Sequence, residues 1–402
     1  MKTSFSLFAC FVASIASAQT ATLLAPSAND QVPAKLVAPS KARDMAMQKL
    51  DHTPVSVAHA INDATLDATP KPYLAQSREF WREVAESELH AGVKFTTTAA
   101  GALVRLSPVG GKVAALDPNS IQLRAGGRTL SATAASATVA DAHALRAAGM
   151  AVPEGTLAFR LAAASGKGEM VIAAPQAQGR YLLHVFEPTS TLIVGLNADR
   201  DTVLANAPIT FRATLADGVH ALRLVSGIVM APDGYSANLA FTRNADGSFS
   251  ATFTPDAAHS TGLQLWEAHA ITTSDDHGLP VQRDAKTAFA VSEATAHFAG
   301  TAQVSKDAGA LHVALDIAAS NASRYQVSGV LYGTGSDGAL HAIALAQSAA
   351  WVGGSTGSID LAYAATSLKD MHAPFELRDL RLVDQASMGL IERRSHGLAF
   401  SN

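Results

Sequence analysis

Four residues in the second half of the chain form its densest group of side chains that can bind a metal ion: Glu267, His269, Asp276 and His277. Glu267 and His269 are two positions apart, so in a β-strand both side chains point to one side. Carboxylate and imidazole groups are the ligands of zinc sites, and carboxylates those of calcium sites. These four are the only metal candidates. We expect them to be ordinary polar residues of a strand and loop, and predict no metal and no cofactor.

Two glycine-rich motifs resemble catalytic or nucleotide-binding signatures. Residues 353–357 match the nucleophile elbow of hydrolases, and residues 333–338 match a dinucleotide fingerprint. The first motif requires a helix after its serine, yet residues 359–363 alternate like a strand. The second requires alternating strands and helices, which the neighbouring sequence lacks. We therefore interpret both as turns, and predict no catalytic residue.

The beginning of the chain has the three parts of a secretory signal peptide. Lys2 is the positive charge, residues 5–15 are apolar, and Ala16-Ser17-Ala18 is a small-residue cleavage site. We expect cleavage after Ala18 and a periplasmic or secreted protein. In the alternative, residues 7–10 are a lipoprotein cleavage box, but the apolar run continues past Cys10. The run is too short to span a bilayer of roughly 30 Å, so we predict no transmembrane segment.

Cys10 is the only cysteine, so cleavage after Ala18 leaves a mature chain without cysteine. Disulfides, thiolate metal sites and cysteine nucleophiles are then excluded from the mature protein. The formal net charge is −4, with both signs scattered along the chain. Neither a basic patch for nucleic acid nor a polybasic run for lipid is present. We expect no nucleic-acid partner.

The hydrophobic pattern predicts an arm followed by three β-rich domains. Residues 19–70 are rich in Ala and Pro without a period, which indicates an arm or linker. Residues 77–90 predict an amphipathic helix with Phe80, Trp81, Val84 and Leu89 on one face, ended by Gly92. From residue 94 onward, short alternating runs between turns predict strands, with one short helix at 140–148.

The strand spacing predicts a mostly β, multi-domain fold. A β-rich N-terminal domain at 71–188, with the short amphipathic helix, precedes two immunoglobulin-like β-sandwiches at 189–292 and 293–402. We expect Trp81 to pack the helix on the first domain, and Trp266 and Trp351 to lie in cores or between domains. Residues 378–384 alternate charged with apolar side chains, which predicts one wet strand face and, as an alternative, a partner surface.

Two segments are similar to a known family of exported bacterial proteins. Residues 78–84, 88–93 and 101–108 resemble the opening of the family called domain of unknown function 4785, and residues 373–385 with 388–390 resemble its last domain. The resemblance spans about residues 74–396. It implies an N-terminal domain followed by two immunoglobulin-like domains, and it implies no activity.

The sequence therefore favours a non-enzymatic envelope or secreted protein. We expect it to bind another protein or a surface polymer through β-sandwich surfaces, strand edges or clefts between domains. The alternative is a hydrolase, or a hydrolase accessory protein, with a site in or beside the N-terminal domain. A pocket that gathers a histidine with two carboxylates would favour the enzyme.

Overall fold

The computed structural model describes residues 18–41, 49–61, 72–110, 115–216, 220–259 and 264–401. The predicted signal peptide, including Lys2 and Cys10, lies outside these residues except for Ala18. The chain divides into two compact units. Unit 1 consists of Met1–Pro70, Asp256–Leu263 and Val291–Asn402, and unit 2 of Lys71–Pro255 and Gln264–Ala290. Within the described ranges, no helix is long and apolar enough to cross a membrane.

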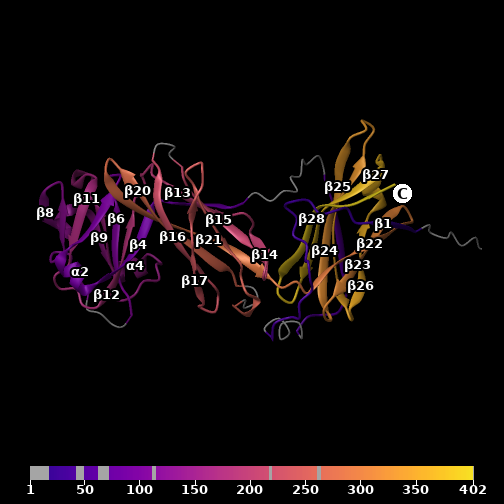
Figure 1. The fold of residues 1–402 in the computed structure, drawn as a ribbon, viewed down its shortest axis with the longest axis horizontal. Helices are drawn as coiled ribbons and strands as arrows, with labels where there is room; N and C mark the ends of the chain where they lie inside the picture. The colour runs from indigo at the N-terminus through magenta and orange to yellow at the C-terminus, as the bar shows by residue number, and fades with distance from the viewer. Residues whose placement is uncertain are drawn as a thin grey trace, which may run out of the picture. The chain divides into compact units, whose positions relative to one another are not determined.

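The N-terminal domain in unit 2 consists of two antiparallel sheets (Figure 1). The larger sheet has the strand order β4-β12-β6-β10-β9 and the smaller one β5-β11-β7-β8. Its elements are β4 (Glu79–Ala85), α2 (Glu86–Ala91), β5 (Val93–Thr97), β6 (Leu103–Pro108), β7 (Gln122–Ala125), β8 (Arg128–Ser131), α3 (Ala132–Ala135), β9 (Ser136–Asp141), α4 (Ala142–Ala147), β10 (Leu157–Leu161), the 3-10 helix η1 (Ala163–Ser165), β11 (Gly168–Ala173) and β12 (Arg180–Phe186). Alternate residues of these strands face a common core, as in the pairs Phe80–Val185 and Val84–Tyr181.

The predicted helix at 77–90 is wrong for most of its length. Residues 79–85 form strand β4, and only α2 is helical. Phe80 and Val84 are four positions apart, which places them on one face of a helix but equally on one face of a strand. Pairing of all seven β4 residues with β12 decides for the strand. Gly92 does end α2, at a φ of 99°, with its N–H donating to the Glu88 carbonyl.

The middle domain of unit 2 is a sandwich of two five-stranded sheets with the orders β18-β19-β15-β13-β3 and β14-β21-β20-β16-β17. Its elements are β3 (Leu74–Ser77), β13 (Val194–Ala198), β14 (Thr202–Leu204), β15 (Ile209–Leu215), β16 (Leu222–Met230), β17 (Ser236–Leu239), β18 (Thr242–Arg243), β19 (Phe249–Phe253), β20 (Trp266–Asp276) and β21 (Leu279–Ser292). The rings of Phe211, Trp266 and Phe289 pack together in its core, which confirms a core position for Trp266. Strand β3 pairs with β13, so the chain passes through the middle domain before it enters the N-terminal one.

The C-terminal domain in unit 1 is also a sandwich, with the sheet orders β1-β22-β23-β26 and β2-β25-β24-β27-β28. Its elements are β1 (Gln19–Thr22), β2 (Val55–Ala60), β22 (Ala296–Asp307), β23 (Ala310–Ala319), β24 (Ser323–Thr334), β25 (Leu340–Val352), β26 (Thr356–Tyr363), the 3-10 helices η2 (Ala257–His259) and η3 (Ala365–Leu368), β27 (His372–Asp384) and β28 (Gly389–Phe400). The prediction of a mostly β protein built from several sandwiches is confirmed.

The arm predicted at 19–70 is more ordered than a tether in its described parts. Strand β1 pairs with β22, and β2 pairs with β25, so the segment supplies an edge strand to each sheet of the C-terminal sandwich. The Arg324 guanidinium also donates to the carbonyls of Asp51 and Thr53. The segment is therefore part of the domain that lies furthest from it in sequence.

Candidate functional site

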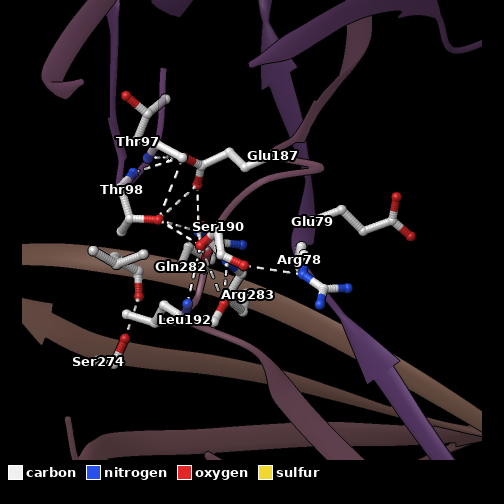
Figure 2. A network of polar contacts seen from close by, with 12 residues as sticks. Arg78, Glu79, Thr97, Thr98, Glu187, Ser190, Leu192, Ser274, Gln282 and Arg283 are labelled. Atoms are coloured by element: carbon white, nitrogen blue, oxygen red, sulfur yellow. Dashed lines mark hydrogen bonds and ion pairs between the residues drawn. The ribbon is translucent and has the colours of Figure 1, made fainter. Parts of the chain in front are cut away.

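A buried ion pair joins the N-terminal and middle domains. Arg283 lies on β21, and its Nη2 donates to Oε2 of Glu187, which follows β12 (Figure 2). The two side chains are 1% and 0% exposed. The second Glu187 oxygen accepts the backbone N–H groups of Thr98, at 2.6 Å, and Ala99, at 2.8 Å. Both buried charges therefore have a partner of opposite charge and further hydrogen bonds.

Hydroxyl and carbonyl groups complete the network around this ion pair (Figure 2). Arg283 Nη2 also donates to the hydroxyls of Thr98, at 3.0 Å, and Ser190, at 3.2 Å. Arg283 Nη1 donates to the Gln282 carbonyl, and Arg78 Nε donates to the Ser190 carbonyl. Removing one partner of such a network leaves buried groups unsatisfied, so the network favours a single arrangement of the two domains.

Strand β4, at the edge of the N-terminal sheet, is capped by side chains of the middle domain. The Trp81 backbone N–H donates to Asp284 Oδ2 at 2.6 Å, and the Gln282 amide donates to the Trp81 carbonyl at 3.5 Å. Unpaired groups on an edge strand invite pairing with other chains. Here the neighbouring domain satisfies one donor and one acceptor.

A pocket of about 480 Å³ lies beside this contact, and we call it the seam pocket. Its lining residues come from β3, β4, β16, β20 and β21, together with Tyr73: Tyr73, Ala75, Gln76, Ser77, Glu79, Trp81, Ile228, His269, Ile271, Asp284, Ala285 and Lys286. Tyr73 is 71% exposed and Ile271 is 41% exposed. The pocket thus presents apolar side chains to solvent beside charged ones.

The Trp81 ring forms one wall of the seam pocket and is held from the side of the N-terminal sheet. It stacks on the His184 ring at 3.7 Å, and the Arg105 guanidinium lies 4.9 Å from its centroid. His184 Nε2 contacts Glu79 Oε2 at 2.7 Å, and this hydrogen bond lowers the pKa of Glu79. These contacts fix the orientation of the Trp81 ring in the absence of a ligand.

Asp284 is the most perturbed carboxyl group of the pocket. Burial raises its pKa to about 6, and the nearby Glu79 carboxylate adds to the rise. The hydrogen bonds from Trp81 and Gln282 and the charge of Arg283 act in the opposite direction. Near neutral pH this carboxyl group is therefore close to the point at which it gains a proton.

Asp284→Asn should make stability less dependent on pH. The folded-state pKa lies above the ordinary value of 3.8, so Asp284 contributes stability that is present below about pH 4 and is lost as the pH rises through about 6. The amide of the variant still accepts the Trp81 N–H. We expect the melting temperature of the variant, relative to wild type, to be higher at about pH 7.5 than at about pH 5. An equal difference at both values would contradict the assignment.

The structure does not bring the four metal candidates together. His269 Nε2 lies 3.1 Å from Glu267 Oε2, and Glu267 also pairs with Lys286. Asp276 lies nine positions after Glu267 on the same strand, β20. At a rise of 3.3 Å per residue, the two residues are about 30 Å apart. Asp276 contacts His277 and His220 instead. Throughout the described ranges, no three His, Cys, Asp or Glu side chains form a group that could hold a metal ion.

Both glycine motifs are turns, as the sequence indicates. Gly333 and Thr334 end β24, and residues 335–339 connect it to β25, with the Gly335 N–H donating to the Ala339 carbonyl. Residues 353–355 connect β25 to β26, which begins at Thr356. Trp351 stacks on His52 at 3.7 Å. Trp81 lies on strand β4, so the prediction that Trp81 packs a helix onto the first domain is wrong.

The charged residues at 378–384 are paired with one another or with their neighbours. Asp379 pairs with Arg381 and Arg393, and Arg378 pairs with Glu376. Asp384 is buried and accepts the Ser323 hydroxyl, so this strand does not have one uniformly wet face.

Sequence reasoning missed the ion pair and the seam pocket. One signal for the ion pair is present in β21, where Val281, Ala285 and Phe289 face the core and Arg283 shares their parity. A charged residue in the inward series of a strand requires a buried partner. The sequence gives no indication that the partner is Glu187.

These features define a multi-domain protein of antiparallel β-sandwiches, in which two of the domains share a polar network and a pocket. Residues 46–187 match the domain of unknown function (DUF4785) N-terminal domain, and residues 295–401 match the DUF4785 C-terminal domain. The chain belongs to the DUF4785 family.

The crystal structure of a DUF4785 family protein from Legionella pneumophila has a similar fold. The TM-score is 0.70 at 16% sequence identity, over 93% of this chain and 98% of that chain. No curated protein matches the sequence. The family matches and the similar structure establish the family and the fold.

Proposed function

We propose that this chain is an exported, non-enzymatic binding protein that holds part of a partner protein or surface polymer in the seam pocket. The observation that carries the proposal is the pocket itself, to which two domains contribute and beside which a buried ion pair holds those domains together. A preformed pocket loses less conformational entropy when it binds a ligand. Pockets between domains are also a common place for ligands.

Export is supported by the residues before position 19. A positive charge at Lys2, an apolar run at 5–15 and the small residues 16–18 have the order of a secretory signal. The periplasm or the cell exterior is then where the partner is met.

The chemistry of the seam pocket favours binding over catalysis. Ser77 supplies the one hydroxyl among the lining residues other than Tyr73, and it contacts the backbone of Glu79 rather than a base. Glu79 is paired with His184, and Lys286 with Glu267. The exposed Tyr73 and Ile271 remain as apolar contact points. A ligand would meet apolar area with a charged rim, as at protein interfaces.

Co-sedimentation with isolated envelope fragments tests the proposal. We expect wild type to sediment with the fragments. Ile271→Lys should bind them at least tenfold more weakly, because the charged lysine side chain then occupies the pocket. Leu224→Lys is the matched control: Leu224 is 62% exposed on β16, in the same sheet, but does not line the pocket. Equal losses in both variants, or no loss in Ile271→Lys, would count against a site in the seam pocket.

A hydrolase is the second candidate, and Asp284 is the observation in its favour. A carboxyl group with a raised pKa beside a second carboxylate is the arrangement of an acid and base pair. If the pocket hydrolyses an envelope polymer, Asp284→Asn will release no product from fragments that wild type degrades, and will still bind them. If wild type releases no product, the binding proposal stands alone.

A further inference from the structure

Strand β2 is an edge strand without the features that usually protect such an edge. It ends the sheet β2-β25-β24-β27-β28, and the described residues supply no strand on its outer side. All six of its residues are exposed, and none is Lys, Arg, Asp, Glu or Pro. Its register with β25 has no bulge. Natural proteins blunt exposed edges with charges, prolines or bulges, because such an edge can pair with another chain.

Two other sheet edges among the described residues are covered. In unit 1 the last strand of the same sheet, β28, is bridged by Leu23 and Gln31, and Asp30 accepts the Ser395 N–H at 2.7 Å. In unit 2 the edge of β4 is capped by Asp284 and Gln282. Among the described residues, β2 has neither a bridging segment of this kind nor a capping side chain from another domain on its outer side.

We propose that β2 pairs antiparallel with β2 of a second copy of this chain. The Ile61 N–H donates to the Ile343 carbonyl, which continues the β25 ladder by one residue. Because bonding alternates along an antiparallel strand, residues 55, 57 and 59 bond to β25, and the backbone groups of Ser56, Ala58 and Ala60 point to the open edge.

The residues of β2 fit a two-fold pairing centred on Ala58. Ala58 then lies opposite Ala58 of the second copy, and Ser56 lies opposite Ala60, so each open backbone group gains a partner. Val57, which is 45% exposed, lies opposite His59. No two charged side chains face each other. The contact is small, so we expect a dimer that dissociates on dilution.

Cysteine cross-linking tests the pairing, because Cys10 is the only native cysteine and is removed as Cys10→Ser. In the full chain with that change, Ala58→Cys should give a disulfide-linked dimer in a concentrated sample, since directly opposite Cα atoms lie within about 5.5 Å. The control Ala60→Cys faces Ser56 and should stay monomeric. Equal cross-linking of both variants, or none of Ala58→Cys, overturns the proposal.

Light scattering across a hundredfold range of concentration gives an independent readout. Wild type should approach twice the monomer mass, whereas Ala58→Pro should remain monomeric with an unchanged melting temperature, since it removes only an outward N–H. Val57→Pro removes a bond to β25 and should lower the melting temperature. A wild type that is monomeric throughout, or an Ala58→Pro variant that still dimerises, contradicts the proposal. Neither result bears on ligand binding in the seam pocket.

Discussion

Glu187→Ala is expected to lower the free energy of unfolding of unit 2 by about 3–5 kcal/mol. The substitution leaves the Arg283 guanidinium buried without its counter-charge, and leaves the N–H groups of Thr98 and Ala99 without their acceptor. Urea denaturation followed by the fluorescence of Trp266, which lies in the core of this unit, measures the loss.

Two further variants show whether burial is the cause. Glu83 pairs with Arg180 at the surface, with both side chains about half exposed, and Glu83→Ala should cost at most about 1 kcal/mol. Glu187→Leu combined with Arg283→Met should restore the part of the loss that comes from the unpaired Arg283 charge, but not the part that comes from the Thr98 and Ala99 N–H groups, which still lack an acceptor. A loss below about 1 kcal/mol in Glu187→Ala would show that the network does not hold the two domains together.

Deletion of residues 19–40 is expected to destabilise the C-terminal domain by at least about 4 kcal/mol, although the deleted residues are remote from it in sequence. The deletion removes strand β1 and the buried Gln31, whose amide donates to the carbonyls of Leu390 and Ile391. It also removes the Leu24 carbonyl, which accepts from Arg394. Each lost hydrogen bond costs about 1 kcal/mol, and the buried groups left unpaired cost more.

Amide hydrogen exchange locates this effect. In the deletion variant, β22 and β28 should exchange at least a hundredfold faster, while β4 and β12 of unit 2 should be unchanged. Unchanged protection of β22 and β28 from exchange would mean that residues 19–40 do not stabilise the C-terminal domain.

The strands were predictable wherever one face is buried and the other wet. Leu157–Leu161 and Ile209–Leu215 carry apolar side chains at every second position, a spacing that fits a strand with one buried face, and both are strands in the structure. Residues 79–85 were not predictable, since a spacing of four suits both a helix and a strand. Residues 19–22 pair with β22, and residues 55–60 pair with β25. Because these partner strands are hundreds of residues away, the sequence around 19–22 and 55–60 does not indicate the pairing.

The candidate site was less predictable than the fold. Its position depends on which strands of two domains meet, and each domain contributes residues that are unremarkable in sequence, such as Glu79 from the N-terminal domain and Ile271 from the middle domain. Asp284 appears in the sequence as an outward strand residue. Its raised pKa follows from burial in the folded structure, with a smaller contribution from the Glu79 carboxylate, and the hydrogen bond from the Trp81 N–H opposes the rise. The metal candidates do not come together because Glu267, His269 and Asp276 lie on one extended strand, in which residues several positions apart are also far apart in space.

Site-specific photo-cross-linking in cells tests the binding site most directly. A photoreactive amino acid at position 271 lies in the seam pocket, and the same group at position 224 lies on the same sheet outside it. We predict a discrete covalent adduct with an envelope component from position 271 and none from position 224. No adduct from 271, or an adduct from 224 alone, would contradict a binding site in the seam pocket.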